Sequence, residues 1–252
     1  MNIVNIMARK GNSFTFNEFI KASKVSANVA WVLLHRLEKR GAIERIEKGK
    51  YLIIPLGAEK GKYTLHEFVI GSLLVKPACI AYWSALHHYH ISEQIPNTVF
   101  IQTTARKKRQ ELEIFGIKYK FVRVKETKFF GARKEWLEET PVEITDREKT
   151  IIDCLDKPQY CGGLIEILKG FKSFKEIFNN DKLIKYALKI GNTGVLRRLG
   201  YITDYYKIKI NIPHVNTRNY LLLDPTLPPK GKNNAKWRVI VNIDEKDIGN
   251  LE

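Results

Sequence analysis

The sequence contains no aspartate before Asp146, although 27 of its 252 residues are acidic. Enzymes that cleave phosphodiesters with metal ions bring several carboxylates together at one site. The first 145 residues could supply only glutamates for such a site. The absence therefore disfavours a metal-dependent catalytic centre in this part of the chain.

Long apolar runs are also absent. The longest, such as Phe68–Val75, fall far short of the roughly 20 residues that a membrane-spanning helix needs. The opening MNIVNIMARKG has neither the apolar segment nor the small-residue cleavage pattern of a secretory signal. We therefore expect a cytoplasmic protein.

The chain has little cysteine and lacks the common catalytic motifs. Its three cysteines, Cys79, Cys154 and Cys161, form no CxxC pair, and we expect them to be reduced and structural. There is no glycine-rich phosphate loop, no internal repeat and no G-x-S-x-G motif for a serine hydrolase. We expect neither a cofactor nor a bound metal ion.

Positive charge is abundant. The chain has 43 Lys and Arg against 27 acidic residues, a net charge of +16. Such a field attracts polyanions, among them DNA, RNA and acidic membrane surfaces. The alternative is a lysine-rich protein whose excess charge is only solvated surface. With 44% hydrophobic residues the chain should fold, and its length allows two domains.

Residues 1–56 have the pattern of a winged helix-turn-helix DNA-binding domain. Thr15 and Glu18 form a capping box, Ser26 is a good N-cap, and Gly41 is a good helix terminator. The expected elements, in order, are a helix at Asn2–Arg9, a one-bridge strand at Phe14, helices from Thr15 to about Ala22 and over Ala27–Arg40, and a hairpin of Ile43–Glu47 with Tyr51–Ile54.

The longer helix is expected to enter the major groove, with the hairpin against the DNA backbone. Val29, Ala30, Leu33 and Leu37 recur at helical spacing and should face the core. The opposite face and the hairpin supply the expected DNA-binding residues, which are Ser26, Asn28, Trp31, His35, Arg36, Lys39, Arg40, Lys48 and Lys50. The region carries ten Lys and Arg against four Glu, which favours DNA. Two alternatives remain: a protein-interaction module, and a Trp31 that packs on the wing or second domain.

Residues 57–64 are expected to form a linker, and 65–252 a mixed α+β domain. Its expected helices are Leu65–Leu74, Ala81–His90, Asp146–Leu155, Gly162–Phe171 and Lys182–Leu199. Its expected strands are Asn97–Thr103, Ile117–Lys125, Val142–Ile144, Leu221–Leu223 and Val239–Ile243. The alternation of IKYKFVRVK shifts phase between Phe121 and Val122, which predicts a β-bulge or strong twist.

A second basic surface is expected in this domain. Its members are Arg106, Lys107, Lys108, Arg109, Lys118, Lys120, Arg123, Lys125, Lys128, Arg197 and Arg198. They could continue a DNA footprint, bind a partner protein or an RNA, or simply protect sheet edges as solvated charge.

Two segments raise the question of catalysis. YWSALHHYH places His87 and His90 on one helical face, but no further metal ligand stands at a telling offset. A packed helix with Tyr82, Ala85, Leu86 and Tyr89 as its apolar stripe is the simpler interpretation. Glu126-Thr127-Lys128 has the E-x-K form of some nucleases but lacks an upstream aspartate.

Six segments in order resemble the AbiEi family, the antitoxin half of abortive-infection toxin–antitoxin operons. They are the N-terminal winged helix, AYWSALHHYHISEQIPNTVFIQTT, FGIKYKFVRVKETKFFG, VEITDREKTIIDCLDKPQYCGG, RRLGY, and YLLLDP with WRVIVN. The resemblance implies a transcriptional autorepressor whose winged helix binds operator repeats. It also implies a C-terminal domain that neutralises a nucleotidyltransferase-type toxin.

We therefore expect a DNA-binding autoregulator that acts as the antitoxin of a type IV toxin–antitoxin system and is not an enzyme. Its expected partners are double-stranded DNA with inverted repeats and either the toxin or the toxin's RNA target. It would bind as cooperative monomers or as a homodimer. The alternative is a metal-dependent nuclease targeted by a winged helix.

Overall fold

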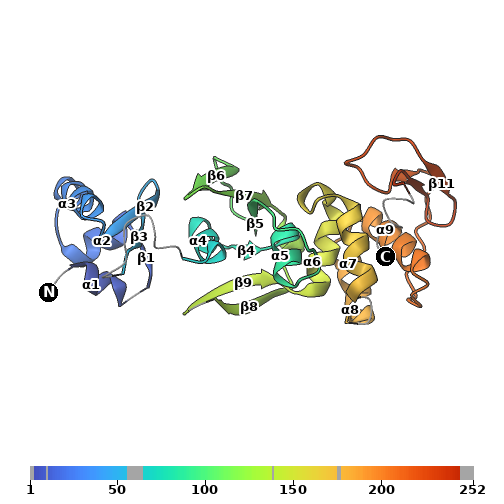
Figure 1. The fold of residues 1–252 in the computed structure, drawn as a ribbon, viewed down its shortest axis with the longest axis horizontal. Helices are drawn as coiled ribbons and strands as arrows, with labels where there is room; N and C mark the ends of the chain where they lie inside the picture. Colours follow the sequence, from blue (N-terminus) through green and yellow to red (C-terminus); the bar gives the residue numbers. More distant parts are fainter. Residues whose placement is uncertain (1–2, 10, 56–64, 138, 175–176, 245–252) are drawn as a thin grey trace.

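The computed structural model describes residues 3–9, 11–55, 65–137, 139–174 and 177–244. Helices and strands are mixed along its length, which confirms the α+β class. Figure 1 shows a row of three parts: an N-terminal helix-and-strand unit, a central sheet, and a helical group that carries a small C-terminal sheet. The predicted linker 57–64 lies outside the described residues.

The N-terminal unit has the element order of a winged helix. Its elements are α1 (Ile3–Ala8), β1 (Ser13–Thr15), α2 (Phe16–Ser23), α3 (Ala27–Lys39), β2 (Ile43–Glu47) and β3 (Lys50–Ile53). The sheet order is β1-β3-β2. The predicted capping box is present, because Thr15 Oγ1 accepts from the Glu18 amide at 3.3 Å and Glu18 accepts from the Thr15 amide at 2.7 Å. Phe19, Ala30, Leu34 and Ile43 are fully buried in the core of this unit.

The central part is a six-stranded mixed sheet in the order β6-β7-β5-β4-β9-β8. Its strands are β4 (Cys79–Ile80), β5 (Thr98–Thr103), β6 (Glu111–Ile114), β7 (Ile117–Arg123), β8 (Ala132–Leu137) and β9 (Thr140–Thr145), with helices α4 (Glu67–Leu74) and α5 (Tyr82–His88). Strands β5 and β7 run parallel in unbroken register from Thr98 and Lys118 to Thr103 and Arg123. Their carboxyl ends therefore meet at one edge of the sheet.

A β-bulge or a strong twist was predicted for β7, and of these two the bulge is wrong. The strand pairs with β5 without a register shift, yet Phe121 and Val122 are both buried. Phe121 belongs to the cluster around α4, and Val122 belongs to the cluster around α5 and the following helices. The alternation breaks because both faces of the sheet are covered at this point, which makes two adjacent positions apolar.

The remainder is mainly helical. It contains α6 (Arg147–Asp156), the short turn η2 (Pro158–Tyr160), α7 (Leu164–Phe174), α8 (Asn180–Lys189), α9 (Thr193–Tyr205), β10 (Leu221–Leu222), β11 (Lys232–Asn234) and β12 (Val239–Val241). Asp146 caps α6 as predicted, accepting from the Lys149 amide at 2.9 Å. The single helix predicted over Lys182–Leu199 is wrong. Gly191 takes a φ of 69° and Asn192 caps α9, so the chain forms two helices.

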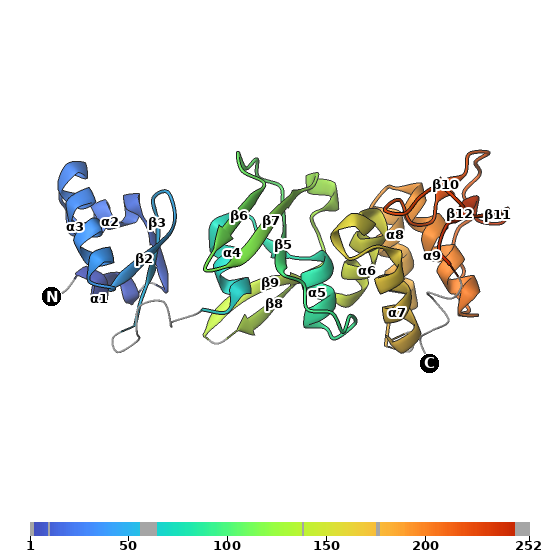
Figure 2. The same ribbon diagram turned by 45° about the horizontal axis from the view of Figure 1, so that its top comes forward.

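The β2–β3 hairpin lies on the side of the N-terminal unit that faces the central part (Figure 2). Ile46 and Leu52 share an apolar cluster with Leu65 and Phe68. Glu47 pairs with Lys107 at 2.8 Å, and Lys50 Nζ donates to the Leu74 carbonyl at 2.6 Å. The hairpin thus connects the two parts through both apolar and charged contacts.

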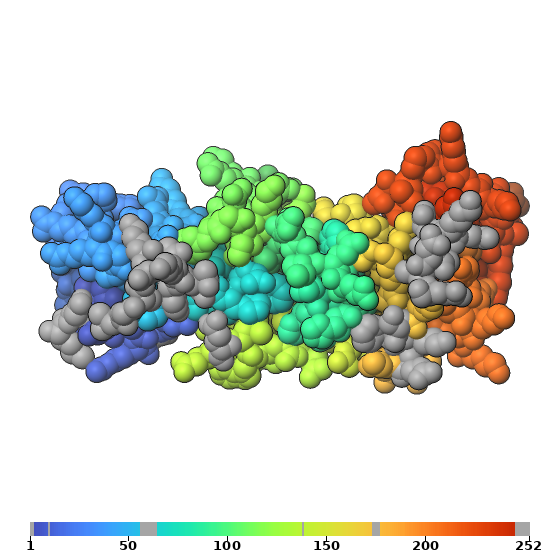
Figure 3. Space-filling view, in the orientation of Figure 1, coloured from blue at the N-terminus to red at the C-terminus, as the bar shows by residue number. Residues whose placement is uncertain are grey.

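In both ribbon views α3 lies at the far end of the row, with the hairpin between it and the central sheet (Figures 1 and 2). On the face shown by the space-filling view, the N-terminal unit meets the central part at the end nearer to the sheet (Figure 3). Of the described helices, none has the length and hydropathy to cross a bilayer.

Candidate nucleic-acid interface

Helix α3 is held by its inner face and leaves its outer face open. Ala30 and Leu34 are buried, and Leu33 and Leu37 are partly buried against the same core. Ser26 is the N-cap residue, but its side chain makes no capping hydrogen bond. Gly41 has a φ of 72° just past the helix, as predicted.

The outer face of α3 carries the predicted recognition residues. Ser26, Asn28, His35, Arg36, Lys39 and Arg40 are all exposed. Within the part of the chain that the structure describes, none of these side chains makes a hydrogen bond or ion pair. Glu38 is the one carboxylate on α3. The face therefore offers amide, imidazole, guanidinium and ammonium donors that no described acidic residue neutralises.

Val29 corrects the sequence interpretation. It was expected in the core but is 46% exposed, and Val32 beside it is 50% exposed. Val32 follows Asn28 by four residues and precedes His35 by three, so all three lie on one helical face. That spacing was visible in the sequence and should have placed Val32 in the candidate interface.

Trp31 lies at the margin of this face. Its ring stacks on Phe16 of α2 with centroids 4.3 Å apart, and 40% of the residue stays exposed. Among the described residues, the aromatic partner of Trp31 lies in α2 and not in the wing or the second domain. Trp31 is thereby fixed in orientation while one side of it remains open.

The two lysines predicted on the wing differ. Lys48 is exposed at the hairpin turn, where a phosphate could reach it. Lys50 instead points back to the central part, where it contacts the Leu74 carbonyl and, at 3.3 Å, Glu47. Burial opposes ionisation of Glu47, but Lys107 and Lys50 outweigh it and lower the pKa of this carboxyl. Lys50 is therefore a connecting residue, and its assignment to DNA is wrong.

Two adjoining hollows form the second basic surface. Their volumes are about 550 and 520 Å³, and Arg123 lines both. No carboxylate is among the lining residues, and the cations that line them are Arg106, Lys107, Lys108, Arg123, Lys125, Lys128 and Lys157. The hollows lie where β5 and β7 end, an edge at which open α/β sheets commonly bind ligands.

Several of these cations are already paired. Lys107 is bound to Glu47, and Lys128 contacts Asp156 at 2.7 Å. Arg123 Nε donates to the Thr104 carbonyl at 3.3 Å. Arg106, Lys108 and Lys125 line the hollows and make no hydrogen bond or ion pair to any described residue. Arg109, predicted with them, is exposed but lines neither hollow.

Arg197 and Arg198 do not belong to this surface, so their prediction is wrong. They are 6% and 8% exposed. Arg197 donates to the carbonyls of Asn219, Trp237 and Arg238, and Arg198 to those of Leu155, Leu222 and Leu223. Burial lowers the pKa of both groups. These arginines tie α9 to the C-terminal sheet.

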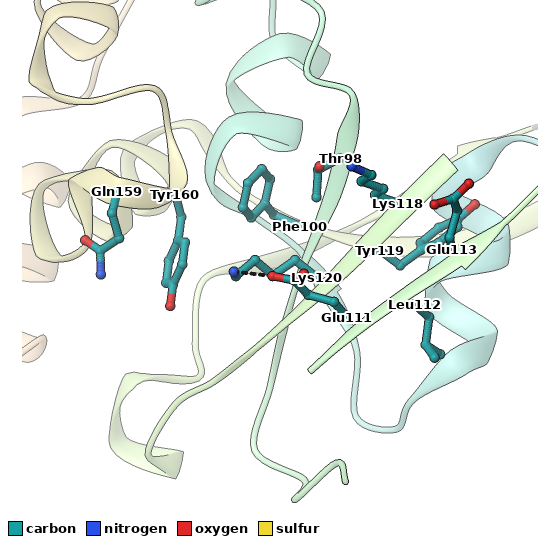
Figure 4. Close-up of a pocket in the computed structure, with 10 residues that line it drawn as sticks. All are labelled: Thr98, Phe100, Glu111, Leu112, Glu113, Lys118, Tyr119, Lys120, Gln159 and Tyr160. Carbon is teal, nitrogen blue, oxygen red and sulfur yellow. Dashed lines mark hydrogen bonds and ion pairs between the residues drawn. The ribbon is translucent and has the colours of Figure 1, made fainter. Parts of the chain in front are cut away.

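A third hollow, of about 610 Å³, lies over the open face of β6, β7 and β5 (Figure 4). Lys118 and Lys120 were predicted as part of the basic surface and line this hollow instead. Lys120 pairs with Glu111 at 2.5 Å, and Glu113 stands opposite Lys118 in the strand register. The charges here balance across the strands, so the face has no marked attraction for anions.

The histidine-rich segment does not form the predicted pair. Helix α5 ends at His88, and His90 lies beyond it with a φ of 58°, so His87 and His90 share no helical face. His88 packs near Phe68 and Tyr89, and burial lowers its pKa. Tyr82, Ala85 and Leu86 are buried as expected.

The nuclease-like residues are also separated. Glu126 is exposed on the short turn η1 (Glu126–Lys128), while Lys128 faces Asp156. Among the described residues, no three His, Cys, Asp or Glu side chains come together as metal ligands. The three cysteines are free and buried, and burial raises the pKa of Cys79 and Cys154.

One strongly perturbed carboxyl lies in the interior. Asp153 is buried beside the ammonium of Lys149, which is fully buried, and accepts from Gln102 Nε2 at 3.2 Å. Burial raises the pKa of Asp153 to about 6. A shifted pKa in a cleft indicates catalysis, but this pair lines none of the three hollows, so it is a packed structural pair.

Comparison with known proteins supports the N-terminal assignment. No curated protein sequence matches the chain. The crystal structure of the RV2827C protein from Mycobacterium tuberculosis is similar over 99% of this chain and 92% of that one, with a TM-score of 0.66 and 12% identity. That likeness establishes a shared fold. Residues 3–54 match the family described as "Transcriptional regulator, AbiEi antitoxin". The predicted resemblance is thus confirmed for its first segment: residues 3–54 are similar to the AbiEi-antitoxin transcriptional regulators.

Proposed function

We propose that the protein is a sequence-specific DNA-binding repressor that acts as the antitoxin of a type IV toxin–antitoxin pair. The single observation that carries the proposal is the outer face of α3, which is exposed and cationic and whose polar side chains pair with no described residue. A winged helix inserts this helix into the major groove. The family match to an antitoxin regulator agrees with this use.

The side chains divide by role. Asn28 lies near the start of α3, where an amide can donate to and accept from one adenine edge at once. Arg36, Lys39, Arg40 and the wing residue Lys48 carry unpaired charge that suits phosphate oxygens. Base contacts would set sequence preference, and phosphate contacts would set register and affinity.

The test uses a duplex from the DNA that precedes the protein's own gene. Asn28→Ala should cost about 1–3 kcal/mol of discrimination between this duplex and a scrambled one. Asn179→Ala is unsuitable as a control because Asn179 caps α8, so we choose Asn233→Ala, an exposed amide in the C-terminal sheet. Equal discrimination by the Asn28→Ala variant and the parent in an anisotropy titration would contradict the assignment.

The second basic surface extends the proposed footprint. The ion pair of Glu47 with Lys107 places the loop between β5 and β6 against the wing hairpin. Arg106, Lys108 and Lys125 would therefore meet phosphates that flank the site read by α3. The hollows have little exposed aromatic surface, which favours contact with the backbone over base stacking.

The antitoxin role needs a separate test. A nucleotidyltransferase-type toxin encoded beside this gene should inhibit the growth of cells that express it alone. Co-expression of the present protein should restore the growth of these cells. A variant lacking the charges of Arg36 and Lys39 should lose repression and keep this protection, because the proposed protective part is the C-terminal domain. Loss of protection in that variant at equal protein level would contradict this division of labour.

A further inference from the structure

The outward face of α3 has an apolar centre set among cations. Val29 and Val32 are 46% and 50% exposed and are neighbours three residues apart on the helix surface. Single exposed apolar residues are ordinary on protein surfaces, but adjoining ones mark interaction sites. Here the neighbours are His35, Arg36 and Lys39, so the surface combines apolar contact with unpaired positive charge.

This combination indicates which ligand binds the face. The cations favour a polyanion, and the valines favour one that carries methyl groups. The major groove of B-DNA presents such groups, because every thymine carries a C5-methyl there. RNA lacks this methyl on uracil, and the deep, narrow major groove of its duplex excludes side chains.

We propose that Val29 and Val32 contact thymine methyl groups beside an adenine bound by Asn28, so that α3 selects sites rich in A·T pairs. The inference rests on the proposed function and names the bases that α3 contacts. Residues three apart on a helix are displaced by about 4.5 Å along its axis. Base pairs are stacked about 3.4 Å apart. The two valines therefore meet the same or neighbouring base pairs.

The test removes one methyl at a time. Duplexes are selected with the full-length protein from a random-sequence library, and the best is resynthesised with each thymine replaced in turn by deoxyuridine. This change deletes the C5-methyl and leaves every hydrogen bond of the base pair intact. For one or two positions, affinity should fall about fourfold, the factor that corresponds to burial of one methyl-sized group at ~0.8 kcal/mol.

Substitutions of the valines show which residue is responsible for the preference for thymine over deoxyuridine. Val32→Ala and Val29→Ala should each abolish the thymine preference at one position, because alanine is too short to reach the methyl. Both sites are exposed and alanine favours helix, so the variants should fold, which a melting curve verifies. Leu188→Ala is the matched control, because Leu188 is 51% exposed on α8. It should keep the parent's preference.

The outcomes separate the two proposals. A thymine preference that disappears in the valine variants and persists in Leu188→Ala supports the inference. Selection of a duplex that binds equally with thymine or deoxyuridine at all positions overturns it and leaves the DNA-binding function standing. A preference that survives both valine changes overturns the assignment to these residues. If no duplex is enriched, the proposed function fails, and the inference fails with it.

Discussion

Removal of two cations from α3 gives the most direct test of phosphate contact. The winged helix has four exposed cations, Arg36, Lys39, Arg40 and Lys48, whose side chains pair with no described residue. Each phosphate neutralised contributes about −0.9 to the slope of log K against log salt, so four contacts predict roughly −3.6. Arg36→Ala with Lys39→Ala should bring this slope to about −1.8.

The effect is large enough to measure by anisotropy on a short duplex. Between 50 and 200 mM salt the parent should lose roughly 150-fold in affinity and the double variant only about 12-fold. Lys209→Ala with Lys230→Ala is the control, because it removes the same net charge from exposed positions in the C-terminal part. A slope within 0.5 of the parent's for the Arg36 and Lys39 variant, or an equal reduction in the control, would refute phosphate contact by this helix.

Three further predictions concern the rest of the chain. Lys125→Ala with Lys108→Ala should weaken binding to a long duplex and leave a duplex that spans only the winged helix unaffected; equal losses on both would contradict an extended footprint. Lys149→Met leaves the buried Asp153 carboxyl without its cation and raises its pKa further. A carboxyl whose pKa is higher in the folded than in the unfolded state stabilises the fold at low pH and destabilises it as the pH rises. The free energy of unfolding of the variant, measured in urea, should therefore fall further below that of the parent from pH 5 to 8, by about 3–5 kcal/mol at pH 8. Lys149→Met with Asp153→Leu should remove the pH dependence of this deficit. Gly200→Ala should destabilise by about 1–3 kcal/mol, since its Cβ would lie 2.4 Å from the Trp237 ring; an unchanged Tm would show that the ring yields freely.

Local signals in the N-terminal part were sufficient to predict its structure. Thr15 with Glu18 marks a helix start and Gly41 a helix end, and each signal depends on residues within a few positions. The hairpin is equally local. The prediction was wrong where the partner lies far along the chain, as for Lys50, which meets Leu74.

The errors in the second domain have the same origin. A pair of adjacent arginines near a helix end looks like a basic patch, because the carbonyls that bind Arg197 and Arg198 come from segments 22 to 43 residues away. Adjacent apolar residues in β7 look like a bulge until both covering layers are known. The short strands β4 and β6 escaped prediction because their pairing depends on β5 and β7.

The candidate site was predictable in part. Helical spacing identified the outward position of Asn28 and His35, and the structure leaves both exposed. The same spacing applied to Val32, which the sequence analysis left unassigned, while Val29 was expected to face inward. The proposed contact with methyl groups would use apolar side chains on the outside, whereas a rule based on burial assigns apolar residues to the core.

The ion pair of Glu47 with Lys107, between the hairpin and the central part, affects how two copies of the protein can be arranged on DNA. If α3 lies in a major groove, this ion pair fixes the angle at which the rest of the chain projects from the duplex. Two copies bound to inverted repeats would project from the same side of the DNA only when the repeats are separated by whole turns of the double helix. Operator spacing would then decide whether the two C-terminal parts stand close enough to share a partner.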